Sequence, residues 1–379
     1  MYFKITEEQE AVKNAARNFA QTELLPGVIE RDSQMKYPDE EVKKMSELGF
    51  MGMTAGIEYG GGGMDTLSYV LAMEEISKID SSCSVIMSVQ NSLVIWAVEN
   101  FGNHEQKLKY LPRLSSGEWI GSFCLSEPEA GSDASQQATH SLDQGDFYLL
   151  NGTKNWITNG GTSNLHIVFA QADSSKKHKG INAYLVESSW DGVKIGKKED
   201  KLGIRSSDTH TILYNDVKIP KSQLMGKEGD GYKIALKTLD GGRIGIAAQA
   251  LGIATGAYEL ALKYSGERMS FGKPIHQHQA IAFKLATMAT EIEAARLLVY
   301  KAAILKDQGL PYSAESAMAK LFASEVAVKT TSEAIQIHGG YGYVKEYHVE
   351  RLYRDAKITQ IYEGTSEIQK IVISRHLIQ

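Results

Sequence analysis

The segment Ile361–Gln369 (IYEGTSEIQ) places the carboxylate of Glu363 between an aromatic residue and Gly364, just before a predicted helix. Ser366 and Gln369 fit the S-x-x-Q capping box, so that helix is expected to begin without help from Glu363. A glutamate works as a general base when burial raises its pKa above the usual value of about 4.3. Local sequence therefore leaves two interpretations of Glu363 open, a solvated cap and a catalytic base.

Two segments in the middle of the chain could hold a ligand. The loop FCLSEPEAGSD carries Ser126 and Ser132, whose hydroxyls and neighbouring amides suit an anionic or heteroaromatic group, although a plain polar turn fits equally well. In NWITNGG, Trp156 and Thr158 are two residues apart and share one face of a strand. They offer a ring for stacking and a hydroxyl for donation, but a tryptophan on a sheet more often belongs to the core.

Three segments near the C-terminal half also combine charged residues with glycine. In LDGGR, Asp240 and Arg243 are three residues apart, which fits a local ion pair as well as a ligand contact. Arg268 in ERMSFGKPI suits either a helix end or a phosphate, and Gly339 and Gly340 in QIHGGYGYV suit a helix C-cap. No His/Cys/Asp/Glu set has metal-ligand spacing, so no metal site is predicted.

The composition narrows the function classes. The net charge of −5 and pI near 6.1 argue against a nucleic-acid binder. The start of the chain resembles neither a secretory signal nor a transit peptide, and no membrane-spanning segment of about 18 or more apolar residues is expected. The expected setting is the bacterial cytoplasm, or the mitochondrial matrix for a processed eukaryotic protein.

Three regions must position these residues. Residues 1–117 and 227–379 show helical periodicity, whereas residues 118–226 contain short runs rich in Val, Ile, Tyr and Thr. The middle region has no ten-residue helical segments between its strands, which predicts an antiparallel sandwich or barrel. The predicted fold class is therefore α+β and multidomain, with a helical N-terminal domain, a middle antiparallel β-domain and a C-terminal helical bundle.

Glycines and small residues refine this prediction. Gly60–Gly63 is interpreted as a tight turn, because no Lys-Ser/Thr follows as a phosphate loop requires. TEEQ near the N-terminus forms a capping box for the first helix. Ala248, Gly252 and Gly256 lie on one helical stripe and should let another helix approach closely.

Taken in order, the motifs resemble those of the acyl-CoA dehydrogenases over essentially the whole chain. The matching segments are TEEQ, FCLSEPEAGSD, NWITNGG, KLGIRSS, DVKIP, LDGGRIGIAAQALGIA, FGKPI, QIHGGYGY, RDAKI and IYEGTSEIQ. The resemblance implies an N-terminal helical domain, a middle β-domain and a C-terminal four-helix bundle. It also implies FAD as cofactor, electron-transferring flavoprotein as electron acceptor, and a homotetramer built as a dimer of dimers with FAD reaching across a subunit interface.

The implied reaction is the α,β-dehydrogenation of an acyl-CoA thioester to the trans-2-enoyl-CoA. Glu363 is the implied base for the α-proton, while the β-hydrogen leaves as hydride to nitrogen 5 of FAD. The Glu363 backbone N–H and a flavin ribityl hydroxyl are expected to polarise the thioester carbonyl.

The resemblance also assigns contacts position by position. Implied FAD contacts are Phe123, Leu125, Ser126, Ser132, Trp156, Ile157, Thr158 and Phe271, with Thr365, Ser366 and Glu367 at the start of the last helix. Expected from a neighbouring subunit around the pyrophosphate and adenosine are Arg268, Gln279, Gln336, Gly339 and Gly340. Implied substrate contacts are Ser132, Asp240, Arg243, Glu363 and Gly364.

Differences from the family pattern narrow the substrate. Gly242 stands where isovaleryl-CoA and long-chain members carry their base, which leaves Glu363 as the candidate. Ser84 stands near the position where glutaryl-CoA members carry an arginine, so a dicarboxylate is disfavoured. A short, possibly branched acyl-CoA is expected. Two alternatives are a flavin oxidase of the same fold and a catalytically inactive subunit that binds acyl-CoA and FAD.

Overall fold

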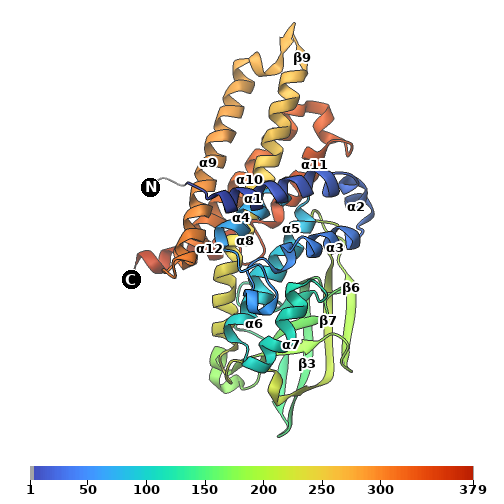
Figure 1. The fold of residues 1–379 in the computed structure, drawn as a ribbon, viewed down its shortest axis with the longest axis vertical. Coiled ribbons are helices and arrows are strands. Elements are labelled where there is room, and N and C mark those ends of the chain that lie inside the picture. Colours follow the sequence, from blue (N-terminus) through green and yellow to red (C-terminus); the bar gives the residue numbers. More distant parts are fainter. Residues whose placement is uncertain (1–3, 379) are drawn as a thin grey trace.

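The computed structural model describes residues 4–378, and it has a helical part, a β-sheet and a second helical part in chain order (Figure 1). The N-terminal helices are α1 (Glu7–Phe19), η1 (Ala20–Leu24), α2 (Val28–Gln34), α3 (Asp39–Glu47), η2 (Phe50–Gly52), η3 (Ile57–Tyr59), α4 (Thr66–Ser77), α5 (Ser81–Ser88), η4 (Val89–Ile95), α6 (Trp96–Phe101) and α7 (His104–Ser115). The order of helical and β regions predicted from periodicity is confirmed.

Local signals in the N-terminal part behave as predicted. Thr6 caps α1, and a reciprocal pair of hydrogen bonds joins it to Gln9: the Gln9 N–H donates to Thr6 Oγ1 at 3.1 Å, and the Thr6 N–H donates to Gln9 Oε1 at 2.9 Å. The glycine run forms a turn packed against the chain before it, because the Gly63 N–H donates to the Ala55 carbonyl at 2.8 Å. A Cβ at Gly61 would lie 2.3 Å from the same carbonyl oxygen, so glycine is required there for close approach.

The β-region forms one eight-stranded sheet. Its strands are β1 (Gly121–Cys124), β2 (His140–Asp143), β3 (Phe147–Thr158), β4 (Leu165–Gln171), β5 (Ile181–Glu187), β6 (Val193–Lys198), β7 (Thr209–Pro220) and β8 (Leu224–Met225), with short helices η5 (Ser174–Gly180) and η6 (Lys221–Gln223). The order is β6-β7-β3-β2-β4-β5-β8, and β1 pairs with β4. The prediction of a wholly antiparallel sheet was wrong in two places, because β1 and β2 both run parallel to β4. The long loop after β1 and the β2–β3 hairpin provide the crossover that a parallel pair requires.

The central strands β4 and β5 are buried on both faces, as their apolar runs require. On one face, Val168 and Tyr184 pack with side chains of β3 and β7, including Leu150 and Ile212, in one apolar cluster. The other face packs on the N-terminal helices through residues such as Phe169. The sheet is therefore held against the helical part by a second core.

The C-terminal part is a bundle of long helices. Its elements are α8 (Gly231–Glu267), β9 (Met269–Ser270), β10 (Lys273–Pro274), η7 (Ile275–Gln277), α9 (Gln279–Asp307), α10 (Ser313–His338), η8 (Gly339–Tyr343), α11 (His348–Ile358) and α12 (Ser366–Leu377). The small-residue stripe of α8 meets the C-terminal end of α4 as predicted. A Cβ at Gly252 would lie 2.4 Å from the Glu74 carbonyl oxygen, and one at Gly256 would lie 2.5 Å from that of Lys78.

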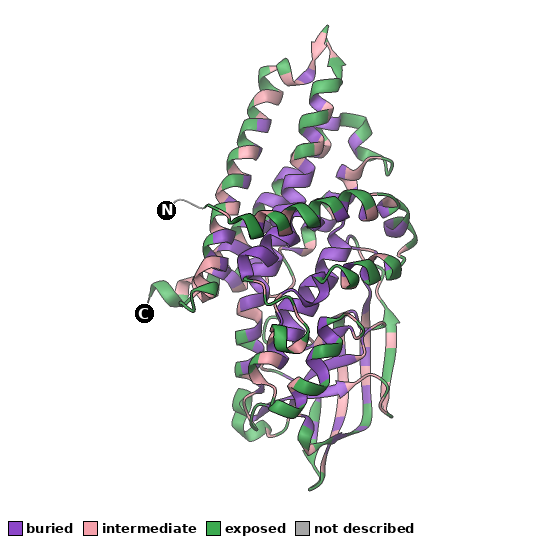
Figure 2. Ribbon diagram, in the orientation of Figure 1, coloured by how far each residue is buried: buried purple, intermediate pink, exposed green. Residues whose placement is uncertain are grey.

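Two helical stretches, Ser81–Phe101 and Gly231–Glu267, are long and apolar enough to cross a membrane by length and composition. The sequence-based expectation of no such stretch therefore needs correction. Their most apolar windows are 94% and 83% buried inside the protein, as in the core helices of a globular fold. Figure 2 shows this burial where α4, α8 and α10 meet, while the ends of α8 and α9 beside β9 are largely exposed.

Candidate active site

A cavity of about 190 Å³ lies where the bundle, the sheet and the N-terminal helices meet, and we refer to it as the base cavity. Its walls come from α5 and η4, from β1 and the loop after it, from the end of β3, from α8 and from the loop before α12. Among the residues singled out from sequence, it brings together Phe123, Leu125, Ser126, Ser132, Trp156, Thr158, Arg243, Glu363 and Gly364.

Glu363 lies in the loop between α11 and α12 with its backbone in the left-handed region. Its φ is +52°, and Gly364 follows at +94°. The carboxylate oxygen Oε2 is buried and has no hydrogen-bond partner among the described residues. Burial raises the pKa of Glu363 to about 7, and the cations Lys320 and Arg243 limit the rise. An enclosed, unpaired carboxylate with a pKa near neutrality is suited to take a proton.

The helix α8 leaves room for this carboxylate because residue 242 is glycine. A Cβ at Gly242 would lie 2.2 Å from Glu363 Oε2 and 2.7 Å from Leu93 Cδ2. Position 242 therefore faces the same point in the cavity as Glu363. A larger residue at 242 would compete with the Glu363 side chain for this space.

The predicted capping box at the start of α12 was wrong by one residue. Thr365 is the N-cap, with extended backbone, and its Oγ1 accepts from the Ile368 N–H at 3.4 Å. Ser366 lies inside the first turn and donates to Glu325 Oε1 on α10 at 2.9 Å. The Gln369 amide donates to the Gly364 carbonyl at 2.8 Å. We call residues 359–365, between α11 and α12, the base loop. Contacts with α10 and with this loop, which sequence spacing does not show, decide which residue caps α12.

Asp240 and Arg243 form the local ion pair that spacing allowed. Ser313 on α10 also donates to Asp240 at 2.9 Å, so the pair is fastened to a second helix. Arg243 is buried and lines the base cavity, whereas Asp240 does not line it. Burial lowers the pKa of Arg243, although the nearby carboxylates of Asp240 and Glu363 oppose this effect.

Trp156 is not a core residue. Its side chain is 62% exposed and lines the base cavity beside Thr158, so the ligand-facing interpretation of this pair is favoured. A bulge between Lys154 and Ile157, with Trp156 at φ +63°, interrupts the regular strand. The Ile157 side chain is buried in the core of the sheet, so only its backbone is free to meet a ligand in the cavity.

A buried lysine that the sequence reasoning missed fastens the FCLSEPEAGSD loop. Lys154 Nζ donates to the Leu125 carbonyl at 3.2 Å and to Glu127 Oε1 at 2.7 Å, and it also contacts Gln137. Glu127 in turn accepts the Ala138 N–H at 2.6 Å. Burial lowers the pKa of Lys154 to about 8. Buried hydrogen bonds therefore hold this loop in place where it lines the cavity, and the alternative of a plain polar turn is disfavoured.

The residues expected from a neighbouring subunit lie elsewhere. Arg268, Gly339 and Gly340 line a separate hollow of about 600 Å³ at the end of the bundle, together with Tyr264, Ser270, Ile275, Ile337, His338, Tyr341 and Val344, and we call this region the bundle tip. Ser270 of β9 lines this hollow, and Figure 1 shows β9 at the end of the bundle. Gln279 and Gln336 are exposed, and Phe271 is 96% exposed. None of these residues lines the base cavity of the same chain.

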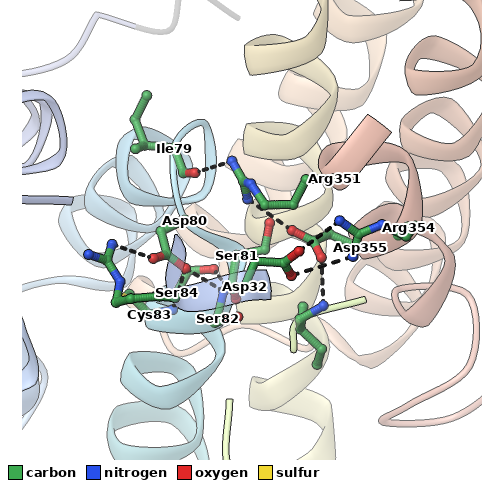
Figure 3. Close-up of polar contacts among 12 residues, drawn as sticks. Asp32, Ile79, Asp80, Ser81, Ser82, Cys83, Ser84, Arg351, Arg354 and Asp355 are labelled. Atoms are coloured by element: carbon green, nitrogen blue, oxygen red, sulfur yellow. Dashed lines mark hydrogen bonds and ion pairs between the residues drawn. The ribbon is translucent and has the colours of Figure 1, made fainter. Parts of the chain in front are cut away.

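A buried polar cluster joins α11 to the N-terminal helices and to the β6–β7 loop (Figure 3). Arg354 on α11 pairs with Asp32 of α2 at 2.7 Å. Asp355 accepts from Arg351 at 3.1 Å and from the Ile204 N–H of the β6–β7 loop at 2.5 Å. Burial raises the pKa of Asp355 to about 6. Since α11 leads into the loop of Glu363, this cluster fixes the helix before that loop relative to α2 and to the β6–β7 loop.

Other chemistry has little support in residues 4–378. That part of the chain holds no group of three or more His, Cys, Asp or Glu arranged for a metal ion. Cys83 and Cys124 are both free and buried. His338 stacks on Tyr264 with ring centroids 4.2 Å apart and bonds to the Ala334 carbonyl at 2.8 Å, as a core histidine does.

Comparisons with known proteins show which proteins this chain resembles over its length. Three family descriptions match the chain: "Acyl-CoA dehydrogenase, N-terminal domain" over residues 6–118, "middle domain" over 122–217 and "C-terminal domain" over 229–378. The short-chain specific acyl-CoA dehydrogenase of Clostridium acetobutylicum is 50% identical, with 99% of both chains covered. The mitochondrial short-chain specific enzyme of Homo sapiens is 49% identical, covering 99% of this chain and 91% of the relative.

Solved structures show the same similarity. Butyryl-CoA dehydrogenase from Megasphaera elsdenii superposes with a TM-score of 0.99 at 47% identity, with both chains fully covered. A chain from a structure described as an electron transferring flavoprotein of Acidaminococcus fermentans superposes equally well, with a TM-score of 0.99, 50% identity and full coverage of both chains.

Proposed function

The chain belongs to the acyl-CoA dehydrogenase family, and we propose that it oxidises a short-chain acyl-CoA to the trans-2-enoyl-CoA with Glu363 as the base. FAD is the cofactor and electron-transferring flavoprotein takes the electrons. The observation that carries the proposal is the position of an enclosed, unpaired carboxylate across one cavity from the exposed Trp156 and from Thr158. A thioester between these two walls presents its α-carbon to Glu363.

Glu363 supplies the proton acceptor. Because its pKa is about 7, a large fraction is ionised at neutral pH while the group stays basic enough to take a weakly acidic α-proton. The Glu363 backbone N–H has no hydrogen-bond partner among the described residues, so it is free to bond the thioester carbonyl. That bond stabilises negative charge on the carbonyl oxygen as the proton leaves.

The cavity residues fit FAD as the second reactant. The exposed Trp156 ring offers a stacking surface, and Ser126, Ser132 and Thr158 offer hydroxyls around it. FAD, when bound there, supplies the hydride acceptor for the β-hydrogen. Phe123 and Leu125 form the apolar wall beside these hydroxyls. Thr365, Ser366 and Glu367 lie at the N-terminus of α12, where backbone amides suit a phosphate or carbonyl group of FAD.

The bundle tip is proposed to complete the cofactor site of another copy. Arg268 is exposed there, and its guanidinium lies over the Tyr341 ring, 5.6 Å from the centroid. An exposed arginine beside Gly339 and Gly340 suits a pyrophosphate. We propose a homotetramer built as a dimer of dimers, in which Gln279, Gln336 and Phe271 join this contact.

The substrate is proposed to be a short, possibly branched monocarboxylic acyl-CoA. The named relatives act on short-chain or butyryl substrates, and Ser84 is a buried serine bonded to the Ser81 carbonyl at 3.0 Å, so it offers no cation for a second carboxylate. Arg243 and Ser132 are proposed substrate contacts, with Asp240 holding Arg243. The bacterial cytoplasm is the proposed setting, or the mitochondrial matrix for a eukaryotic source.

The test is anaerobic flavin reduction by butyryl-CoA, followed by absorbance. Glu363→Gln should retain FAD but reduce it about 10²–10⁴-fold more slowly than the wild type. Glu99→Gln is the matched control, because Glu99 also has a pKa raised by burial but lies outside the base cavity. Undiminished bleaching in Glu363→Gln would overturn Glu363 as the base. Faster reoxidation of the reduced enzyme by oxygen than by electron-transferring flavoprotein would favour the oxidase alternative.

A further inference from the structure

We propose that Lys320 is a positioning residue for the base: its ammonium holds the loop of Glu363 in the left-handed conformation and stabilises the ionised carboxylate. The inference rests on the proposed role of Glu363. Lys320 lies on α10, opposite α8, and sequence reasoning gave it no role. It touches the base loop rather than the cavity.

The contact is specific and buried. Lys320 is fully buried, and Nζ donates to the Gly364 carbonyl oxygen at 2.6 Å. This is the one hydrogen bond that the Lys320 side chain makes within residues 4–378. The same oxygen accepts from Gln369 Nε2 at 2.8 Å. Two donors from different helices therefore converge on the carbonyl that follows Glu363.

The loop needs such a restraint. Glu363 and Gly364 both have left-handed backbone, and this conformation is unfavourable for a residue with a Cβ such as Glu363. A charge-assisted hydrogen bond at the next carbonyl is stronger than a neutral one and would oppose relaxation of the loop. Relaxation would turn the Glu363 carboxylate away from the α-carbon of the substrate.

The burial of Lys320 also calls for an explanation. Its helical neighbours on the buried stripe are Ser316, Ala323 and Ala327, at which a small or apolar side chain packs well. A buried ammonium without a close carboxylate is unfavourable unless an interaction offsets its desolvation. Within the described residues, Lys320 forms no ion pair within 4 Å, so the base loop is the interaction that remains.

The charges around the base leave Lys320 a distinct electrostatic role. Arg243 faces Glu363 from α8 but is already paired with Asp240. Tyr69 on α4 and Tyr362, which precedes Glu363, also lie near the carboxylate, and their hydroxyls donate to Ser88 and Gln249. Near Lys320, the further carboxylates are Glu325, which is bonded to Ser366, and the exposed Glu367.

Lys320 and Glu363 both have pKa values close to neutrality. Burial lowers the pKa of Lys320 to about 8, and burial raises that of Glu363 to about 7. Between these values, Lys320 is largely protonated while Glu363 is ionised. Removal of the ammonium would therefore raise the pKa of Glu363 further and delay its ionisation to higher pH.

The experiment is the pH dependence of single-turnover flavin reduction by butyryl-CoA in three variants of the holoenzyme. Lys320→Met removes the donor and the charge, Lys320→Gln keeps a donor without charge, and Lys320→Arg keeps both. Lys320→Met should shift the midpoint of the pH–rate profile upward by about one pH unit and, through the smaller ionised fraction of Glu363, slow reduction at pH 7 about fivefold. In Lys320→Gln the midpoint of the pH–rate profile should be shifted as in Lys320→Met, but the rate of flavin reduction should recover at high pH. In Lys320→Arg the midpoint should return toward that of the wild type.

A second readout does not depend on turnover. The melting temperature at pH 8 is compared for the wild type, Lys320→Met, Glu363→Gln and the double variant. Lys320→Met should lower it more when Glu363 is present than when residue 363 is glutamine, since the ionised carboxylate then loses its cation. Additive effects would mean that Lys320 acts only through packing.

Lys201→Met is the matched control. Lys201 also donates to a backbone carbonyl, that of Ser207 at 2.7 Å, and burial lowers its pKa to about 8, but it lies in the β6–β7 loop. The pH–rate profile of Lys201→Met should have the same midpoint as that of the wild type. If Lys320→Met does not fold, the midpoint of Lys320→Gln decides. Wild-type enzyme that butyryl-CoA does not bleach would overturn the proposed function, whereas bleaching with an unshifted midpoint in the Lys320 variants would overturn only this inference.

Discussion

The base cavity and the bundle tip contrast within one molecule. The base cavity gathers Trp156 and Thr158 from the sheet and Arg243 and Glu363 from the C-terminal part into one site. The bundle tip presents Arg268 and two glycines at an open end of the bundle, away from that cavity. One group has its partners within the chain, and the other is proposed to find them on a second copy. The motif residues are therefore proposed to form two half-sites, one in each of two copies.

The strongest test of this division is complementation. Arg268→Glu should weaken FAD retention at least about a hundredfold, because a like charge would face the pyrophosphate, and Glu363→Gln should not turn over. When the two variants are co-expressed, a copy with an intact base cavity can receive an intact tip from its neighbour. Activity should return in about a quarter of the sites if copies pair at random. Butyryl-CoA oxidation by the mixed protein that stays at the level of the single variants would show that the tip does not serve another copy.

Gly242→Ala should damage the base cavity alone. The new Cβ would lie 2.2 Å from Glu363 Oε2, so the carboxylate must move, and flavin reduction should slow by about 10–100-fold. FAD absorbance should be retained. Gly241→Ala is the control, since its Cβ would come no closer than 3.4 Å, to Lys306 Nζ. Equal rates for the two variants, measured by stopped flow, would contradict the tight placement of Glu363 against α8.

Glu363 should also make the stability of the protein depend on pH, whereas residues of the bundle tip should not. Its pKa is about 7 in the folded protein against 4.5 for the free group, so the folded state binds the proton more tightly. Stability contributed by this group is therefore present below about pH 4.5 and falls as pH rises toward 7, by up to about 3 kcal/mol. Glu363→Gln should raise the melting temperature at pH 8 and change it little at pH 4.5. Gln336→Ala at the tip should show the same difference at both pH values.

The smallest expected effect is at the tip. Tyr341→Leu removes the ring under Arg268, whose guanidinium lies 5.6 Å from the centroid. A cation–π contact of this kind contributes about 0.5–1 kcal/mol, so FAD affinity should fall about two- to fivefold. Flavin reduction in the FAD-saturated variant should match the wild type. A slower chemical step there would link the tip to the base cavity and weaken the comparison.

Sequence reasoning predicted the features that local patterns encode. The capping box of Thr6, the turn at Gly60–Gly63 and the close approach at Gly252 depend on near neighbours or on one helical stripe, and the structure confirms all three. The order of helical and β regions follows from periodicity in the same way. The proposal that Glu363 is the base came from the resemblance, because local sequence left a cap and a base both open.

What the sequence missed depends on contacts between distant segments. Lys154 and Lys320 lie on a strand and a helix whose patterns are otherwise ordinary, and their partners are backbone carbonyls of other elements. A charged residue on the apolar stripe of a bundle helix was the available signal for Lys320. The bulge at Trp156 and the shift of the α12 cap to Thr365 likewise follow from tertiary packing, which motif spacing does not encode.

The left-handed backbone of Glu363 has a consequence for how this enzyme can change over generations. Glycine would adopt φ +52° without strain and would bury no carboxylate, so losing the base should make the protein more stable. A duplicated gene released from selection for dehydrogenation would be expected to lose Glu363 early. Its product would keep the fold and the exposed Trp156. Descendants that only bind acyl-CoA should then be recognisable by glycine or asparagine at this one position.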